Sequence, residues 1–324
     1  LHLEGSLTPE TVVALAQRHG KDLPLQEARG RFTFHDFAGF LDAYLWASHF
    51  LRQPEDYAFL LRRQLERLRQ QNVLYVEFIL SAGLVLWKKQ DLDQVLAALQ
   101  AATEEERKKD PPVVVGWILD AVRHLGPEHV ARVADYALRW KQAGVVAFNI
   151  GGDEARGPAE LFRGSFERVR AAGLHVTVHA GETDGPQSIW AALRALGAER
   201  IGHGLAAFRD ASLMDHLQRE CIPLEVCPTS NLRTGALALH TGENDLRRHP
   251  LVDYTRRGLA VTLNTDDPGF FQTTLNQEYA LAHELGLTRQ ELIRVAQTGF
   301  EAAFCDDAMR ARLLAHFREH VAAL

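Results

Sequence analysis

Residues 175–182, HVTVHAGE, form a short run of β-branched and apolar residues that ends in a histidine and a glutamate. Runs of the same kind lie along the rest of the chain, at residues 73–80, 113–122, 145–152, 200–204, 222–231 and 260–268. Their near-continuous apolar character is typical of parallel strands that helices cover on both faces. The intervals between them, roughly 20 to 40 residues, suit an alternation of strands and helices.

The first residues, LHLEG (1–5), read as the remaining part of an eighth strand. Eight strands alternating with helices favour a (β/α)8 barrel of the TIM type, although an open doubly wound sheet also fits the pattern. Two helices have marked starts, one where Thr8 precedes Pro9 and one where Glu291 follows Thr288 by three residues. No linker rich in proline, glycine or serine divides the chain, so we expect a single domain over residues 1–324.

The composition narrows the class of protein. The chain is 46% hydrophobic and 24% charged, with a formal net charge of −6. A nucleic-acid-binding surface usually carries a basic patch, so we expect no nucleic-acid partner. The richest apolar run, residues 73–87, contains Glu77 and is too short to cross a bilayer, so we expect no membrane partner. The three cysteines lack CxxC spacing, which favours a reducing cytoplasm.

Polar and ionisable residues stand at the carboxyl ends of several predicted strands. They are His2 and Glu4, His179 and Glu182, His203, Ser230 and Asn231, and Asp266 and Asp267. In a closed barrel these strand ends meet at one rim, where enzymes of this fold place their chemistry. We therefore expect these side chains to converge in space.

The adjacent carboxylates Asp266 and Asp267 need an explanation, because buried like charges repel unless a cation compensates them. Imidazole nitrogens and carboxylate oxygens are good zinc ligands, and a catalytic zinc keeps one position for water. One aspartate is then a metal ligand, and the other accepts a proton or a hydrogen bond from the activated water. The simpler alternative is a solvated turn at the Asp-Pro sequence.

Two further residues have the chemistry of acid or base catalysts. Glu182 is placed to protonate a substrate nitrogen, and His203 to orient or deprotonate the water. A lone histidine at a strand end is more often a hydrogen-bonded structural residue, so the prediction depends on the whole set occurring together. Other histidines are interpreted as structural or surface residues: His35, His49, His124, His216, His283 and His316.

The ordered motifs resemble the adenosine deaminase family of the amidohydrolase superfamily. They are LHLEGS (1–6), VHAGE (178–182), RIGHG (200–204), EVCPTSN (225–231) and LNTDDPGFF (263–271). The resemblance covers essentially the whole chain. It implies a (β/α)8 barrel with one zinc ion that removes the 6-amino group of a purine by hydrolysis. The implied partner is a small-molecule purine nucleoside or base.

By this resemblance the zinc ligands are His2, His179 and Asp266. The family has an H-x-H pair in its first strand, and this chain begins one residue after the position of the first histidine. We expect that the leading residues are missing from the sequence, because a barrel needs most of that strand. A true loss of the first histidine would leave two nitrogens and one carboxylate and would weaken metal binding.

The resemblance also assigns the catalytic groups. Glu182 would protonate purine N1, and His203 would assist the attacking hydroxide. Asp267 would hold that hydroxide and N7, and the backbone amide of Gly152 would contact N3. Asn149 stands where the family usually has an aspartate.

Substrate identity depends on less specific features. Glu4 replaces the aspartate that contacts ribose in adenosine deaminases, and is similar to adenine and some aminodeoxyfutalosine deaminases. The sequence TDDPGFF (265–271) looks more like the nucleoside branch, since the free-base branch typically has serine before its paired aspartates. Residues 34–51 are either a packed helix or a lid over the substrate, with these lining residues: Phe37, Phe40, Leu41 and Tyr44.

Two other functions fit part of the pattern. A binuclear amidohydrolase commonly bridges its metals with a carboxylated lysine on the fourth strand, and residues 145–152 contain no lysine. An inactive nucleoside-binding protein would require the true absence of the first histidine. The leading prediction is a zinc-dependent deaminase of an adenine-containing nucleoside, with adenine and aminodeoxyfutalosine as alternative substrates.

Overall fold

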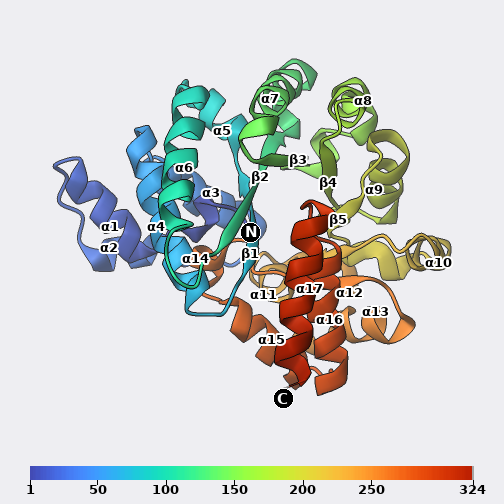
Figure 1. Cartoon of the computed structure of the whole chain (residues 1–324). Helices are drawn as coiled ribbons and strands as arrows, with labels where there is room; N and C mark the ends of the chain where they lie inside the picture. The colour runs from blue at the N-terminus through green and yellow to red at the C-terminus, as the bar shows by residue number, and fades with distance from the viewer. Residues whose placement is uncertain (323–324) are drawn as a thin grey trace.

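The computed structural model describes residues 1–322 (Figure 1). Within these residues, seven parallel strands follow one another in the sheet in the order of the sequence. The strands are β1 (Tyr75–Leu80), β2 (Val114–Val122), β3 (Val145–Gly151), β4 (His175–Ala180), β5 (Arg200–His203), β6 (Leu224–Val226) and β7 (Val261–Leu263).

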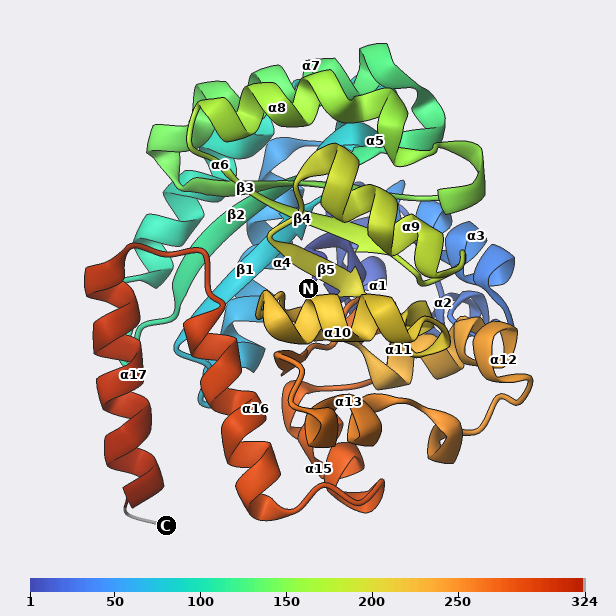
Figure 2. The ribbon, with the colours of Figure 1, turned by 90° about the vertical axis from the view of Figure 1, so that its right-hand side faces the viewer.

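Helices lie around the outside of the curved sheet in both views (Figures 1 and 2). They are α1 (Pro9–Arg18), α2 (Leu25–Arg31), α3 (Phe37–Ser48), α4 (Pro54–Arg69), α5 (Ala82–Trp87), α6 (Leu92–Glu106), α7 (Pro127–Trp140), α8 (Arg163–Ala171), α9 (Pro186–Ala191), α10 (Ala211–Arg219), α11 (Pro228–Arg233), α12 (Ala236–Thr241), α13 (Leu251–Arg257), α14 (Pro268–Phe271), α15 (Leu275–Glu284), α16 (Arg289–Glu301) and α17 (Asp307–Ala322). No helix in residues 1–322 is both long enough and apolar enough to cross a membrane.

Both predicted helix caps are confirmed. The side chain of Thr8 accepts a hydrogen bond from the backbone N–H of Thr11 at the start of α1. Thr288 and Glu291 form a capping box at the start of α16, in which each side chain accepts a hydrogen bond from the backbone N–H of the other. Each cap satisfies backbone N–H groups that a helix cannot pair internally.

The N-terminal residues close the sheet into a barrel. The backbone N–H of His2 donates to the carbonyl of Asp266, and that of Leu3 donates to the carbonyl of Ile79, both at 2.9 Å. Residues 1–3 therefore lie between β7 and β1, at the position of an eighth strand, but they form a single bridge and no extended ladder. The predicted (β/α)8 architecture is confirmed.

Two predicted strands are shorter than expected. The strand predicted at 222–231 ends at Val226, because Pro228 begins helix α11 and has no N–H for a strand ladder. The strand predicted at 260–268 ends at Leu263. The prediction that Ser230 and Asn231 stand at a strand end was therefore wrong. They lie in the first turns of a helix that still begins at the rim.

A buried ion-pair network fills the amino-terminal end of the barrel. Arg200 on β5 pairs with Glu225 on β6 at 2.7 Å and with Glu77 on β1. Glu77 also accepts the backbone N–H of Phe304, whose ring centroid lies 3.5 Å from the Arg200 guanidinium carbon. The network thus joins three strands to the segment that follows α16. Removing one partner of such a network leaves an uncompensated buried charge.

We expect Arg200→Met to lower the free energy of unfolding by about 3–5 kcal/mol, because Glu77 and Glu225 would lose their buried cation. Chemical denaturation monitored by circular dichroism measures this change. Arg247→Met is the matched control, since the ion pair of Arg247 with Asp245 is exposed. Equal stability of the two variants would contradict a stabilising role for the network.

Candidate active site

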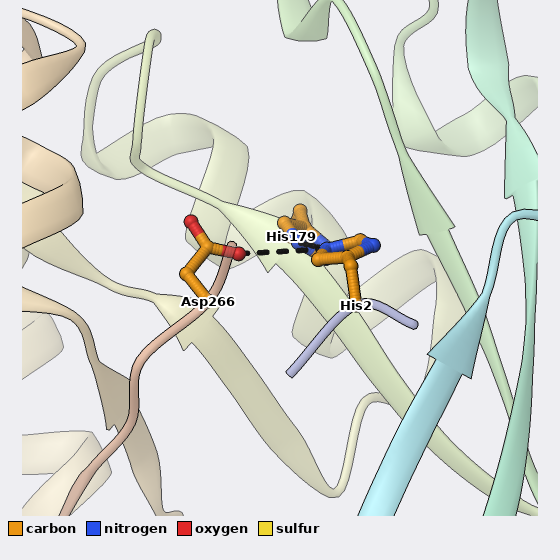
Figure 3. Close-up of side chains that lie close together, drawn as sticks. All are labelled: His2, His179 and Asp266. Atoms are coloured by element: carbon orange, nitrogen blue, oxygen red, sulfur yellow. Dashed lines mark hydrogen bonds and ion pairs between the residues drawn. The ribbon is translucent and has the colours of Figure 1, made fainter. Parts of the chain in front are cut away.

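The three predicted metal ligands meet at the carboxyl ends of the strands (Figure 3). His2 comes from the closing segment, His179 from the end of β4, and Asp266 from the loop after β7. The Nε2 atom of His2 lies 3.3 Å from Nε2 of His179 and 3.5 Å from Oδ1 of Asp266. Residues that are far apart in the sequence thus present three ligand atoms to one point.

The spacing of these atoms fits a tetrahedral metal ion. Ligands bound to zinc at about 2.0–2.1 Å in tetrahedral geometry lie roughly 3.3–3.4 Å from one another. The two separations given above, 3.3 and 3.5 Å, are close to this value. Burial, the largest effect in each case, lowers the pKa of His2 to about 4 and the pKa of His179 well below its usual value. Both imidazoles are therefore neutral at pH 7, as a metal ligand requires.

Neighbouring side chains orient the ligands. A metal-binding Nε2 leaves the proton of His179 on Nδ1. This atom lies 2.9 Å from Nδ2 and 3.3 Å from Oδ1 of Asn149, and of these two only Oδ1 can accept the proton. The amide nitrogen of Asn149 donates to Asp120 on β2 at 2.8 Å. The hydroxyl of Ser230 donates to Oδ2 of Asp266 at 2.7 Å, which leaves Oδ1 to face the histidines. Such outer contacts fix the orientation of ligands in metal sites.

Two buried carboxylates at this rim have an oxygen without a hydrogen-bond partner among residues 1–322. These atoms are Oδ1 of Asp267 and Oε1 of Glu4. Burial raises the pKa of Asp267, and the adjacent Asp266 raises it further. Burial also raises the pKa of Glu4 to about 7. Free polar atoms in a buried site are suited to bind a polar ligand, because leaving them unpaired is costly.

Gly5 permits the close approach of Asp267 to the N-terminal segment. A Cβ atom at residue 5 would lie 1.9 Å from Oδ1 of Asp267. Real Cβ atoms do not approach other atoms so closely, so only glycine fits here without a shift of the aspartate. The motif LHLEG thus carries the predicted ligand His2, the unpaired oxygen of Glu4 and the space for the second aspartate.

The predicted acid and its histidine neighbour lie beside the metal ligands. Nε2 of His203 is 3.6 Å from Oε2 of Glu182 and 3.9 Å from Oδ2 of Asp266. Burial raises the pKa of Glu182 to about 7, so a substantial fraction of this carboxyl carries a proton at neutral pH. Burial lowers the pKa of His203, but the charges of Glu182 and Asp266 outweigh it and raise the pKa. A dication beside Asp266 would oppose that increase.

A buried glutamate that sequence reasoning missed positions this acid. The carboxylate of Glu154 accepts hydrogen bonds from the backbone N–H groups of Gly181, Glu182 and Thr183 at 2.8, 2.9 and 2.8 Å. It also accepts the hydroxyl of Ser188. The loop HAGE therefore wraps around one carboxylate, which fixes the backbone of Glu182. The sequence feature that could have identified Glu154 is an acidic residue close to the predicted end of the strand at 145–152, in GGDE (151–154).

We expect Glu154→Gln to lower kcat/KM by about 10–100-fold, since an amide cannot accept all of these hydrogen bonds and Glu182 would shift. Ammonia release and bound metal are the measurements, and metal content should be unchanged because Glu154 contacts no ligand side chain. Glu160→Gln is the control, because Glu160 is exposed. Loss of metal in Glu154→Gln would show that Glu154 supports the ligands and does not act only on Glu182.

The remaining predicted substrate-binding residues lie around the same rim. Gly152 follows β3 with φ +89°, and a Cβ atom there would lie 3.0 Å from Nδ1 of His124. His124, which was predicted to be structural, is exposed and lies next to Gly152. His124 follows closely after β2 in the chain, which brings it to the rim beside the predicted purine contact.

Helix α3 covers an aromatic cluster beside Asp267. The ring of Phe40 packs against Phe270 and Phe271 of α14 at centroid distances of 5.9 and 5.0 Å. The hydroxyl of Tyr44 lies 2.8 Å from that of Ser81, whose backbone N–H donates to Glu4. Phe37 and Leu41 are partly buried on the same helix. This placement is compatible with the predicted lid, which stays a prediction.

A parallel barrel that gathers two histidines, an aspartate and a protonatable glutamate at its carboxyl rim defines a metal-dependent hydrolase of the amidohydrolase type. The model of the family described as adenosine deaminase matches residues 1–320. The chain therefore belongs to the adenosine deaminase family.

Named relatives and solved structures agree with this assignment. The chain is 37% identical to an aminodeoxyfutalosine deaminase of Streptomyces coelicolor, over all of this chain and 83% of the relative. It is 37% identical to an adenine deaminase of Agrobacterium fabrum, over 97% of this chain and 95% of the relative.

The crystal structure of an adenine deaminase from Arthrobacter aurescens superposes with a TM-score of 0.91 at 29% identity, covering 99% of this chain and 97% of that one. A Burkholderia ambifaria amidohydrolase with bound Zn superposes with a TM-score of 0.88 at 25% identity, covering 99% and 88%. Like the relatives named adenine deaminase and aminodeoxyfutalosine deaminase, the chain is a hydrolytic deaminase that acts on an adenine-type substrate.

Proposed function

We propose that the protein is a zinc-dependent deaminase that hydrolyses the 6-amino group of an adenine-containing nucleoside and releases ammonia. The observation that carries the proposal is the tetrahedral spacing of His2, His179 and Asp266 beside Glu182. The Zn-bound amidohydrolase of the same fold supports zinc as the metal. Bound at these ligands, zinc would lower the pKa of a water molecule to about 7 and supply hydroxide at neutral pH.

The side chains of this chain would perform the remaining steps. Glu182, whose raised pKa leaves it partly protonated, would donate a proton to purine N1 as oxygen adds to C6. Asp267, whose Oδ1 has no partner among residues 1–322, would accept a hydrogen bond from the attacking oxygen and, once protonated, would donate one to N7. The backbone N–H of Gly152 would contact N3. These four contacts would fix the ring plane and place C6 opposite the incoming oxygen.

Two features favour a nucleoside over a free base. Thr265 precedes the paired aspartates, where the free-base branch typically has serine. The aromatic cluster of α3 and α14 begins directly after Asp267 in the chain, and its rings would offer apolar contacts to a substituent of the purine. The substrate named for the Streptomyces coelicolor relative is a nucleoside of this kind, whereas the Agrobacterium fabrum relative supports adenine as the alternative.

The binuclear alternative makes a different prediction about metal. No lysine lies on β3, so the chain lacks the bridging ligand that this alternative needs. We expect one zinc ion per chain in the purified protein. Inductively coupled plasma mass spectrometry together with the protein concentration measures this ratio, and two metals per chain would favour the binuclear alternative.

A substrate panel tests the proposed reaction. Zinc-loaded protein is assayed for ammonia release with adenosine, deoxyadenosine, adenine and aminodeoxyfutalosine, and kcat/KM is compared. We expect one of the nucleosides to have the highest value. Turnover of adenine alone would overturn the nucleoside assignment, and no turnover of any of them would overturn the proposed function.

A further inference from the structure

A chain of three buried side chains leads from the proposed active site to the backbone of α13. Nδ1 of His203 lies 3.1 Å from Nδ2 of Asn231, and Oδ1 of Asn231 lies 3.1 Å from Nε2 of His249. Nδ1 of His249 accepts the backbone N–H of Leu251 at 3.1 Å. All three side chains are buried, so these hydrogen bonds have no competition from bulk water.

The Leu251 end of the chain fixes the direction of every hydrogen bond. A backbone N–H is always a donor, so Nδ1 of His249 must be an acceptor and carry no proton. Burial also lowers the pKa of His249 to about 3, which keeps the ring neutral. The single proton of the His249 ring is therefore on Nε2, which donates to Asn231.

The orientation of the Asn231 amide then determines which atom donates in its hydrogen bond with His203. Its oxygen accepts from His249, so its amide group faces His203 and donates to Nδ1 of that ring. Reversing the amide would place two donors against each other at His249. Nδ1 of His203 therefore carries no proton, and in the neutral ring the proton is on Nε2, the atom that faces Glu182 and Asp266.

We propose that Asn231 and His249 are positioning residues that hold His203 in the Nε2–H tautomer, so that it donates a hydrogen bond to the attacking oxygen and does not deprotonate it. The inference rests on the proposed function, because it assigns a role in the same reaction. A ring with its proton already on Nε2 has no lone pair there to accept another. The proton of the attacking water must then pass to a carboxylate, and Asp267 has a free oxygen at this rim.

Nuclear magnetic resonance tests the tautomers directly. Zinc-loaded protein labelled with 15N in its histidine rings is recorded in a two-bond 1H–15N correlation without substrate. Signals of His203 and His249 are assigned from His203→Asn and His249→Gln. We expect the Nε2–H pattern for both rings, and an Nδ1–H pattern for His203 would overturn the proposal.

Two variants separate positioning from packing. Asn231→Asp keeps the size but offers only acceptors, so His203 should change to the Nδ1–H form and kcat should fall by at least about 100-fold. His249→Gln still offers an N–H to Asn231, so the His203 tautomer should remain and kcat should fall much less than in Asn231→Asp.

An equal loss of turnover in both variants, with the His203 tautomer unchanged, would overturn the positioning role. The ring signals are read without substrate. A protein that deaminates no purine would therefore refute the proposed function while leaving the tautomer result to stand by itself.

Discussion

Glu182→Gln is expected to lower kcat by about 10²–10⁴-fold, the usual contribution of a positioned acid or base. Glutamine has nearly the same shape and can donate a hydrogen bond to a ring nitrogen, but it cannot give up the proton. Addition of water to C6 places negative charge on N1, and that charge must be neutralised as it develops. Burial gives Glu182 the raised pKa that makes it a proton donor near neutral pH.

The metal should remain bound in this variant, because Glu182 is not one of the three ligands. Activity is measured as ammonia release at saturating substrate, and metal content is measured on the same samples. Glu243→Gln, at an exposed position, is the matched control and should behave like the unsubstituted protein. Retained turnover in Glu182→Gln would refute the assignment of this residue as the acid.

Much of the fold could be predicted because the strands are buried on both faces. Residues 73–80 and 175–182 are largely apolar along the strand. At the carboxyl-terminal rim of the barrel, the residues that face the candidate active site are polar. This change of character is enough to identify His179 and Glu182 as rim residues from the sequence alone. The adjacent aspartates gave a second, independent sign, since two buried carboxylates need a compensating cation.

Other features depend on contacts between segments that are distant in the sequence, so no local sequence pattern predicts them. The first residues lack an extended strand ladder and are held by two backbone hydrogen bonds with Ile79 and one with Asp266. Glu154 resembles an ordinary loop acid in the sequence, and its role appears only because the loop after β4 folds around it. His249 was overlooked because it follows two arginines in a polar stretch, although it is buried.

Asn149 stands where the family usually has an aspartate, and its contacts give a physical reason for the difference. The side chain lies between His179 and Asp120, and an asparagine can accept from the first while donating to the second. An aspartate at residue 149 would face another carboxylate at Asp120. Burial and the nearby Glu4 raise the pKa of Asp120, so this part of the site already opposes additional negative charge. The amide satisfies both neighbours without that charge.

His179→Ala is expected to remove the metal and to lower turnover by about 10⁴-fold or more. Water without a bound cation has a pKa of about 15.7, so hydroxide would be nearly absent at neutral pH. Of the three predicted ligands only His2 and Asp266 would remain. One nitrogen and one carboxylate are too few for a tight zinc site. Metal per chain after dialysis and ammonia release are the two measurements.

The matched control is His175→Ala, on the same strand. His175 lies at the other end of β4, where it is partly exposed and pairs with Glu199 at 2.8 Å. Both variants remove one imidazole from β4, but only the loss at the rim should affect metal and activity. A His179→Ala protein that keeps a tightly bound metal and its turnover would show that His2, His179 and Asp266 do not form the metal site. Every catalytic role assigned above depends on the attacking oxygen coming from a metal at His2, His179 and Asp266, so those roles would then have to be reassigned.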